Sequence, residues 1–146
     1  GVNHAIQALT ADEVNARLNA AMEYGRKLPS ANGKVGVVGF CWGGSVSFLA
    51  NTRLGLPAVS YYGARTVPFL DEALRAPMMF HFGERDASIP AEVVEQHRSK
   101  QPTARIHVYP GADHAFNRDV DNHVHDPASA EQAWRRTLDF FGENLR

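Results

Sequence analysis

The single cysteine of the chain lies between two glycines, in the stretch Gly39-Phe40-Cys41-Trp42-Gly43. This is the spacing of a nucleophile elbow, Gly-x-Ser-x-Gly, with cysteine in place of serine. In such a turn a strand passes directly into a helix, and the glycines let the two elements approach closely. The helix N-terminus favours a thiolate, and the first N–H of the helix, that of Trp42, faces a developing oxyanion. We therefore expect Cys41 to be a nucleophile.

The same stretch is also compatible with a structural cysteine in a glycine-rich turn that binds phosphate. However, the sequence around Cys41 contains neither the Gly-x-Gly-x-x-Gly pattern nor the lysine pattern of a P-loop. Nucleotide binding is therefore the weaker interpretation.

A cysteine nucleophile needs a base, and the base needs an acidic group that orients it. Asp86 follows the third predicted strand, and His114 follows the fourth. The carboxyl ends of parallel strands meet at one edge of the sheet, where the sites of such proteins gather. We expect His114 to be the base and Asp86 to orient it. Glu84 is a rival acid, and Asp86 could instead cap the helix that follows it.

The remaining histidines have other interpretations. His107 alternates within a predicted strand, which indicates a packing role. His123, His125 and Asp126 lie close together in the sequence and could bind a metal ion, although histidines in loops are commonly only solvated. Tyr61 is expected to line either the substrate pocket or the core.

Strands and helices alternate along most of the chain, which predicts one domain over residues 1–146. The pattern predicts an α/β fold with a mainly parallel sheet and helices on both faces. Thr10 and Glu13 have the spacing of a capping box at the start of the first helix. The expected strands span residues 33–40, 57–63, 77–83 and 104–111, and the expected helices span 8–29, 45–55, 90–101 and 126–146, with an irregular connection over 64–76. In the last helix we expect four apolar residues to be core: Trp134, Leu138, Phe140 and Phe141.

The composition excludes several classes of function. The net charge of the 146 residues is −1 and no basic cluster is present, so nucleic-acid binding has no electrostatic support. No apolar stretch is long enough to span a bilayer, and the chain does not start with a signal-peptide pattern. One cysteine cannot form an internal disulfide, which fits a reducing cytoplasm.

The motifs GFCWGG, SYYG, GERDASIP and YPGADHAF together resemble the dienelactone hydrolase family of the α/β-hydrolases. The resemblance implies hydrolysis of a small lactone or ester by a triad of Cys41, His114 and Asp86, without a metal or other cofactor. It also implies that Arg118, in the stretch HAFNR, binds a substrate carboxylate. Phe40 and Tyr62 are expected to contact the substrate.

The resemblance departs at the start of the chain, because full-length members of the family have further strands before the elbow. Those strands carry the second oxyanion donor, so the sheet is expected to be incomplete on that side. The strand over residues 33–40 would then have an open apolar edge. We expect either a further N-terminal segment or a second copy of the chain to cover it. Two alternatives remain open: a fragment or binding module without catalysis, and a redox-responsive thiol protein that uses Cys41.

Overall fold

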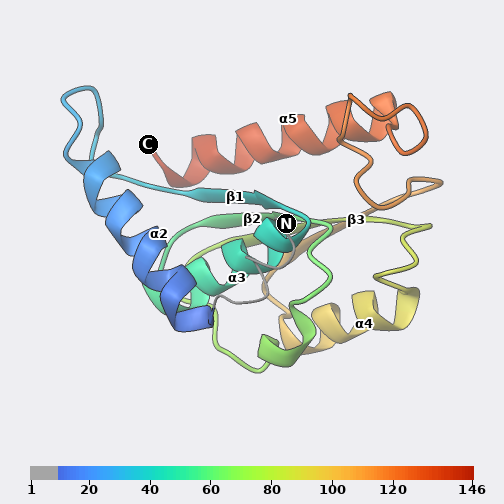
Figure 1. Ribbon diagram of the computed structural model, residues 1–146, viewed down its shortest axis with the longest axis horizontal. Helices are drawn as coiled ribbons and strands as arrows, with labels where there is room; N and C mark the ends of the chain where they lie inside the picture. The colour runs from blue at the N-terminus through green and yellow to red at the C-terminus, as the bar shows by residue number, and fades with distance from the viewer. Residues whose placement is uncertain (1–9) are drawn as a thin grey trace.

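The computed structural model describes residues 10–146, which form a parallel sheet between two layers of helices (Figure 1). The strand order is β1-β2-β3-β4, the same as the order in the chain. The strands are β1 (Val37–Phe40), β2 (Ala58–Tyr61), β3 (Met78–Gly83) and β4 (Arg105–Tyr109). The helices are α2 (Ala11–Arg26), α3 (Trp42–Leu54), α4 (Ala91–Lys100) and α5 (Pro127–Asn144), with a short 3-10 helix η1 (Val67–Phe69). This is the predicted fold class.

The strand order explains the layers. Connections between parallel strands are right-handed, so connections that always step in one direction lie on one face of the sheet. Helices α3 and α4 occupy that face, with α2 beside α3, and α5 covers the opposite face (Figure 1). Both β2 and β3 are buried along their whole length, as expected for strands covered on both faces.

The first helix begins where the sequence predicts. Thr10 Oγ1 accepts a hydrogen bond from the N–H of Glu13, and the Glu13 carboxylate accepts one from the N–H of Thr10. This is the predicted capping box. The expected helix also included residues 8 and 9, which lie outside the described residues.

Two predicted boundaries near the elbow were wrong. The strand expected over residues 33–40 is reduced to β1, Val37–Phe40. The helix expected from residue 45 begins three residues earlier, at Trp42, directly after Cys41. The turn is therefore tighter than the apolar pattern indicated, and the helix N-terminus lies at the cysteine itself.

In α5, two of the four predicted core residues are exposed. Ala133, Thr137 and Phe140 recur at helical spacing and form the buried stripe of α5. Phe140 is buried and Phe141 partly so, as expected, whereas Trp134 and Leu138 are 44% and 54% exposed. Each of these two follows a residue of the buried stripe and is therefore rotated by about 100° away from it.

Strand β1 lies at the edge of the sheet and pairs with β2 alone within residues 10–146. Val38 and Phe40 on β1 are 37% and 39% exposed. Because Gly39 faces α3, side-chain alternation directs Val38 and Phe40 to the α5 side of the sheet. Among the described residues, the expected open apolar edge is present.

Candidate active site

The backbone of Cys41 is strained at the point where β1 ends and α3 begins. Its φ and ψ angles are 55° and −122°, which non-glycine residues rarely adopt. Its N–H donates to the carbonyl oxygen of Tyr61 at 3.0 Å, and its own carbonyl accepts from the N–H of Gly44 at 2.9 Å. This is the geometry of a nucleophile elbow. The first N–H of α3, that of Trp42, needs no partner within its own helix and can donate to a ligand.

The close approach of strand and helix depends on Gly39 and Gly44. A Cβ at Gly39 would lie 1.8 Å from the carbonyl oxygen of Gly43, and one at Gly44 would lie 2.7 Å from that of Tyr61. At Gly43, no described atom lies within 4 Å of an added Cβ, apart from its chain neighbours and its own helix backbone. We expected steric crowding to require glycine at position 43, and this expectation was wrong. The crowding requires glycine one residue later, at Gly44.

Asp86 and His114 are directly hydrogen-bonded. Asp86 Oδ2 lies 2.6 Å from His114 Nδ1, and the Asp86 side chain is fully buried. The other oxygen, Oδ1, accepts the N–H of Ser88 at 2.9 Å, which fixes the carboxylate in its turn. Because a carboxylate only accepts, His114 donates from Nδ1, and the lone pair of the neutral ring is then on Nε2.

Two alternatives were open for the acid: that Asp86 caps the following helix, and that Glu84 takes its place beside the histidine. Helix α4 begins at Ala91 after Pro90, so Asp86 does not cap it. The rival acid, Glu84, accepts the N–H of Gly111 at 2.8 Å and holds the loop that follows β4.

Three non-glycine residues within residues 10–146 have a positive φ: Cys41, Tyr62 and Ala115, with angles of 55°, 40° and 62°. They follow β1, β2 and β4, and Ala115 is the neighbour of His114. The Tyr62 ring lies 5.2 Å from the His114 ring between centroids. Strained backbone gathers at functional sites because the surrounding structure must hold it in place. The strain at Tyr62 and Ala115 was not predictable from the sequence, since neither residue type favours a positive φ.

The electrostatics of Cys41 correct one expectation. Burial raises the pKa of the Cys41 thiol, and the negative charge of Asp86 raises it further, while the positive charge of Arg118 lowers it. The expected thiolate at rest is therefore not favoured. Asp86 and Arg118 both lie within electrostatic reach of Cys41, so the structure brings together four of the predicted site residues: Cys41, Asp86, His114 and Arg118.

The aromatic residues around the site divide into two groups. Tyr62 is nearly fully buried against His114, and burial, followed by the charge of Cys41, raises the pKa of its hydroxyl. The Phe40 ring is partly exposed, 6.3 Å from the Tyr62 ring between centroids. Tyr61 is fully buried, and its hydroxyl lies 2.9 Å from Thr137 Oγ1. Tyr61 thus belongs to the core rather than to the pocket.

The loop histidines do not belong to a cluster of three or more metal-binding side chains among the described residues. The part of the chain that the structure describes contains no group of three or more His, Cys, Asp or Glu placed to hold a metal ion. Asp126, which the sequence grouped with His123 and His125, caps α5 by accepting the N–H of Ser129. His107 stacks on His81 with 5.7 Å between ring centroids, in agreement with a packing role.

One functional candidate was missed by sequence analysis. His81 lies in the middle of the buried strand β3, and both of its ring nitrogens have side-chain partners. The signal was a single polar residue in the otherwise apolar run PMMFHFG.

None of the helices over residues 10–146 is long and apolar enough to cross a membrane.

Comparison with known proteins agrees with this geometry. The sequence profile of the dienelactone hydrolase family matches residues 2–145. Carboxymethylenebutenolidase of Pseudomonas putida is 34% identical over 129 residues, which cover 84% of this chain. Carboxymethylenebutenolidase 1 of Cupriavidus pinatubonensis is 35% identical over 128 residues, with the same coverage.

Solved structures give the same result. A Klebsiella pneumoniae protein, provisionally named a dienelactone hydrolase, superposes with a TM-score of 0.85 at 30% identity over 94% of this chain and 63% of its own. A dienelactone hydrolase-like phosphotriesterase from metagenomic libraries, 19% identical with a TM-score of 0.74, shares the α/β-hydrolase fold.

The matched region is a part of each relative. The chain spans about half the length of the curated relatives, 54% for both carboxymethylenebutenolidases named above. Within that part, the profile match extends over almost every residue of the chain. The chain therefore belongs to the dienelactone hydrolase family of α/β-hydrolases.

Proposed function

We propose that this chain carries the catalytic triad of a hydrolase that cleaves a small lactone or ester bearing a carboxylate. Cys41 is the nucleophile, His114 the general base and Asp86 the group that orients it. The observation that carries the proposal is the 2.6 Å contact between buried Asp86 and His114 Nδ1, at the sheet edge where Cys41 stands in a strained turn. The names of the carboxymethylenebutenolidase relatives support the substrate class.

In the first half of the reaction, the substrate carbonyl binds with its oxygen near the N–H of Trp42. His114 Nε2 takes the thiol proton as the sulfur attacks the carbonyl carbon. The raised pKa of Cys41 makes this proton transfer part of the attack rather than a step that precedes it. The tetrahedral intermediate collapses, the ring or ester C–O bond breaks, and the leaving oxygen takes the proton from His114.

In the second half, water attacks the thioester carbon and gives a proton to His114. The C–S bond then breaks, and the proton returns to the sulfur of Cys41. Asp86 holds one proton on Nδ1 by accepting from it, so Nε2 is the nitrogen that gains and loses a proton, and the charge of Asp86 stabilises the imidazolium that forms twice in each cycle.

Substrate selection is assigned to residues that border Cys41. Arg118 is exposed and within electrostatic reach of the thiol, so its guanidinium can bind a substrate carboxylate through two parallel hydrogen bonds. Phe40 offers a partly exposed aromatic ring, whereas Tyr62 is nearly fully buried and packs behind it against His114. A reducing compartment such as the cytoplasm keeps a single thiol such as that of Cys41 reduced, which supports a cytoplasmic location.

Mass spectrometry after mixing with an activated ester such as 4-nitrophenyl acetate tests the proposal. We expect a burst of 4-nitrophenol and one acetyl group on Cys41, lost in Cys41→Ala and strongly slowed in His114→Ala. Glu84→Gln is the matched control, because Glu84 belongs to the same loop without contacting His114. Acetylation at another residue, or a burst that survives in Cys41→Ala, would falsify the triad.

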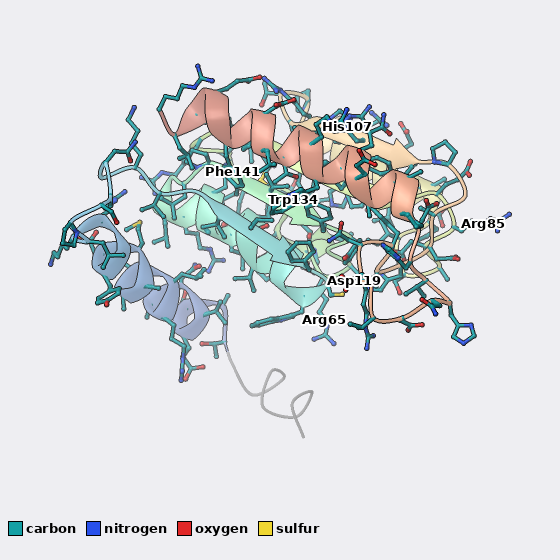
Figure 2. The ribbon with its side chains drawn as sticks, turned by 90° about the horizontal axis from the view of Figure 1, so that it is seen from above. Arg65, Arg85, His107, Asp119, Trp134 and Phe141 are labelled. Atoms are coloured by element: carbon teal, nitrogen blue, oxygen red, sulfur yellow. The ribbon has the colours of Figure 1, made fainter. Side chains whose placement is uncertain are left out.

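A second part of the proposal concerns the open side of the sheet. We define the β1 flank as Val38, Phe40, Trp134 and Leu138, whose side chains are all partly exposed. Figure 2 shows Trp134 and Phe141 on the side of α5 that faces β1, and Phe141 packs on Gly36 immediately before β1. We propose that a further strand, from a longer polypeptide or from a second copy of the chain, pairs with β1 and that apolar residues cover the flank.

This second part bears on activity. Trp42 supplies one oxyanion donor, and the resemblance to the family assigns the second donor to strands that precede the elbow. Loss of a single oxyanion donor can slow turnover by about 10²–10³. Turnover by residues 1–146 alone is therefore expected to be well below that of the completed sheet.

A further inference from the structure

A chain of hydrogen-bonded side chains crosses the core between α5 and the sheet, and the proposed reaction does not use it. His81 Nδ1 lies 2.9 Å from the hydroxyl of Tyr109, and Nε2 lies 3.0 Å from Thr137 Oγ1. Thr137 Oγ1 is also 2.9 Å from the Tyr61 hydroxyl, and Arg136 donates to the Tyr109 hydroxyl at 3.1 Å. Tyr61, His81 and Thr137 are fully buried.

The partners determine where each proton lies. Thr137 Oγ1–H donates to the Ala133 carbonyl at 2.9 Å, because a carbonyl only accepts. The oxygen of Thr137 must then accept from both Tyr61 and His81 Nε2–H. Since Arg136 only donates, the Tyr109 hydroxyl accepts from it and gives its own proton to His81 Nδ1. In this arrangement every donor has one acceptor, and His81 is neutral with its proton on Nε2.

The surroundings of His81 support the neutral form. The pKa of His81 is lowered to about 3, mainly by burial and then by the neighbouring charges of His107 on β4 and Arg136 on α5. A buried histidine is tolerated in the centre of a sheet only when both nitrogens are satisfied. Thr137 therefore supplies one of the two contacts that this position requires.

The main chains of the same residues hold the strained part of the site. The carbonyl of Tyr61 accepts the N–H of Cys41 at 3.0 Å, and the carbonyl of His81 accepts the N–H of Tyr62 at 2.8 Å. Cys41 and Tyr62 are two of the residues with a positive φ. Cys41 is thus held by Tyr61, and Tyr62 is held by His81. The side chains of both Tyr61 and His81 donate to Thr137 Oγ1.

We propose that Thr137 is a positioning residue for the active site. By accepting hydrogen bonds from Tyr61 and His81 at once, it fixes the two carbonyls that hold the backbone of Cys41 and Tyr62. Helix α5 then does more than cover the sheet, because one of its hydroxyls determines where the nucleophile stands. The catalytic consequence rests on the proposed function, whereas the structural link between Thr137 and the two amides does not.

Amide hydrogen exchange at Cys41 and Tyr62 tests this link without any need for turnover. Thr137→Val keeps the shape of the side chain but removes the acceptor, whereas Thr137→Ser keeps the hydroxyl. In Thr137→Val we expect exchange at both amides to accelerate by about tenfold or more relative to Val59 in the centre of β2, since two buried donors lose their partner. Thr137→Ser should stay within about twofold of the unchanged protein.

General loss of stability is controlled with Phe140→Leu. Phe140 lies on the same buried face of α5 and has no hydrogen bond to Tyr61 or His81 through its apolar side chain. This variant should lower the melting temperature but leave the exchange ratio of Cys41 and Tyr62 to Val59 unchanged. An unchanged ratio in Thr137→Val, or an equal change in Phe140→Leu, would overturn the positioning role.

Ester hydrolysis provides the second measurement. In Thr137→Val we expect kcat for 4-nitrophenyl acetate to fall about tenfold with KM little changed, because geometry rather than binding is lost. If exchange accelerates while the unchanged protein shows no acylation, the positioning role stands and the proposed function fails. If Thr137→Val does not fold, Tyr61→Phe removes one donor and strands no polar group; exchange at Cys41 should still accelerate, and an unchanged rate contradicts the proposal.

Discussion

His114 Nδ1 lies 2.6 Å from Asp86 Oδ2, and Asp86 Oδ1 is held in turn by the N–H of Ser88. The carboxylate of Asp86 is therefore held at both oxygens, one by a backbone N–H and the other by the ring of His114. Asp86 is fully buried at its side chain, whereas that of His114 is 36% exposed. A base that must exchange protons with substrate and water is thus accessible, and the acid that orients it is not.

Asp86→Asn should reduce acylation of Cys41 by roughly 10²–10⁴-fold, because an amide can donate to Nδ1 and thereby favour the unproductive tautomer of His114. The Asn oxygen can still accept the N–H of Ser88, so the fold should survive. Stopped-flow release of 4-nitrophenol measures the rate, with Glu84→Gln as the control. A loss smaller than about fivefold would mean that His114 does not need this carboxylate.

Arg118→Lys should reduce hydrolysis of carboxylate-bearing lactones by about 10–100-fold more than that of neutral esters of similar size. Lysine keeps the charge but cannot form two parallel hydrogen bonds with a carboxylate. The ratio of kcat/KM values for a matched acid and methyl ester measures the effect. Equal losses for both substrates would exclude carboxylate recognition by Arg118.

Alkylation of Cys41 by iodoacetamide should accelerate with pH through a midpoint above the ordinary thiol value of about 8.5, because burial raises its pKa. Removing the negative charge in Asp86→Asn should move the midpoint down, and removing the positive charge in Arg118→Gln should move it up. The alkylation rate of the folded protein is measured at each pH by mass spectrometry. A midpoint below about 7 would show that the helix N-terminus outweighs burial.

Stability should decrease as the pH falls below about 6.5, the value of an unfolded histidine. Burial lowers the folded-state pKa of His97, and that of His81 to about 3, so the unfolded state binds more protons in this range. Each histidine contributes a slope of up to about 1.4 kcal/mol per pH unit. Urea unfolding between pH 7.5 and 5 measures the free energy of unfolding.

His97→Gln should flatten this slope, because the His97 ring is fully buried against Phe80 and Phe82. Its Nε2 has no hydrogen-bond partner among residues 10–146. His123→Gln, at an exposed position, is the control and should leave the slope unchanged. Equal slopes in all three proteins would show that His97 does not titrate on unfolding.

Light scattering of residues 1–146 should report association rather than a monomer, because β1 presents an unpaired edge beside the apolar β1 flank. Val38→Lys places a charge on this edge and should shift the distribution toward monomer. Val120→Lys, at a position 82% exposed outside the flank, should not. A stable monomer that unfolds cooperatively would contradict the proposed pairing of β1.

The short-range features were predictable from the sequence. The spacing around Cys41 fixes a strand, a tight turn and a helix, and the Thr10–Glu13 pair fixes where α2 begins. The positions of Asp86 and His114 after two parallel strands were sufficient to bring them to one edge of the sheet. The elbow and the helix start depend on backbone geometry over a few residues, which local residue types specify directly. The meeting of Asp86 and His114 follows from the rule that the carboxyl ends of parallel strands lie at one edge of the sheet.

The tertiary structure decided what depends on distant neighbours. Trp134 and Leu138 follow a core-like helical pattern, yet they are exposed because they lie beside the stripe of α5 that packs on the sheet. The pKa of Cys41 rises instead of falling, because burial and Asp86 outweigh Arg118. Thr137 gains its place beneath the site only because α5 packs on β2 and β3 next to Tyr61 and His81. Burial, charge and hydrogen-bond satisfaction are set by which segments meet, and residue spacing along the chain does not specify that.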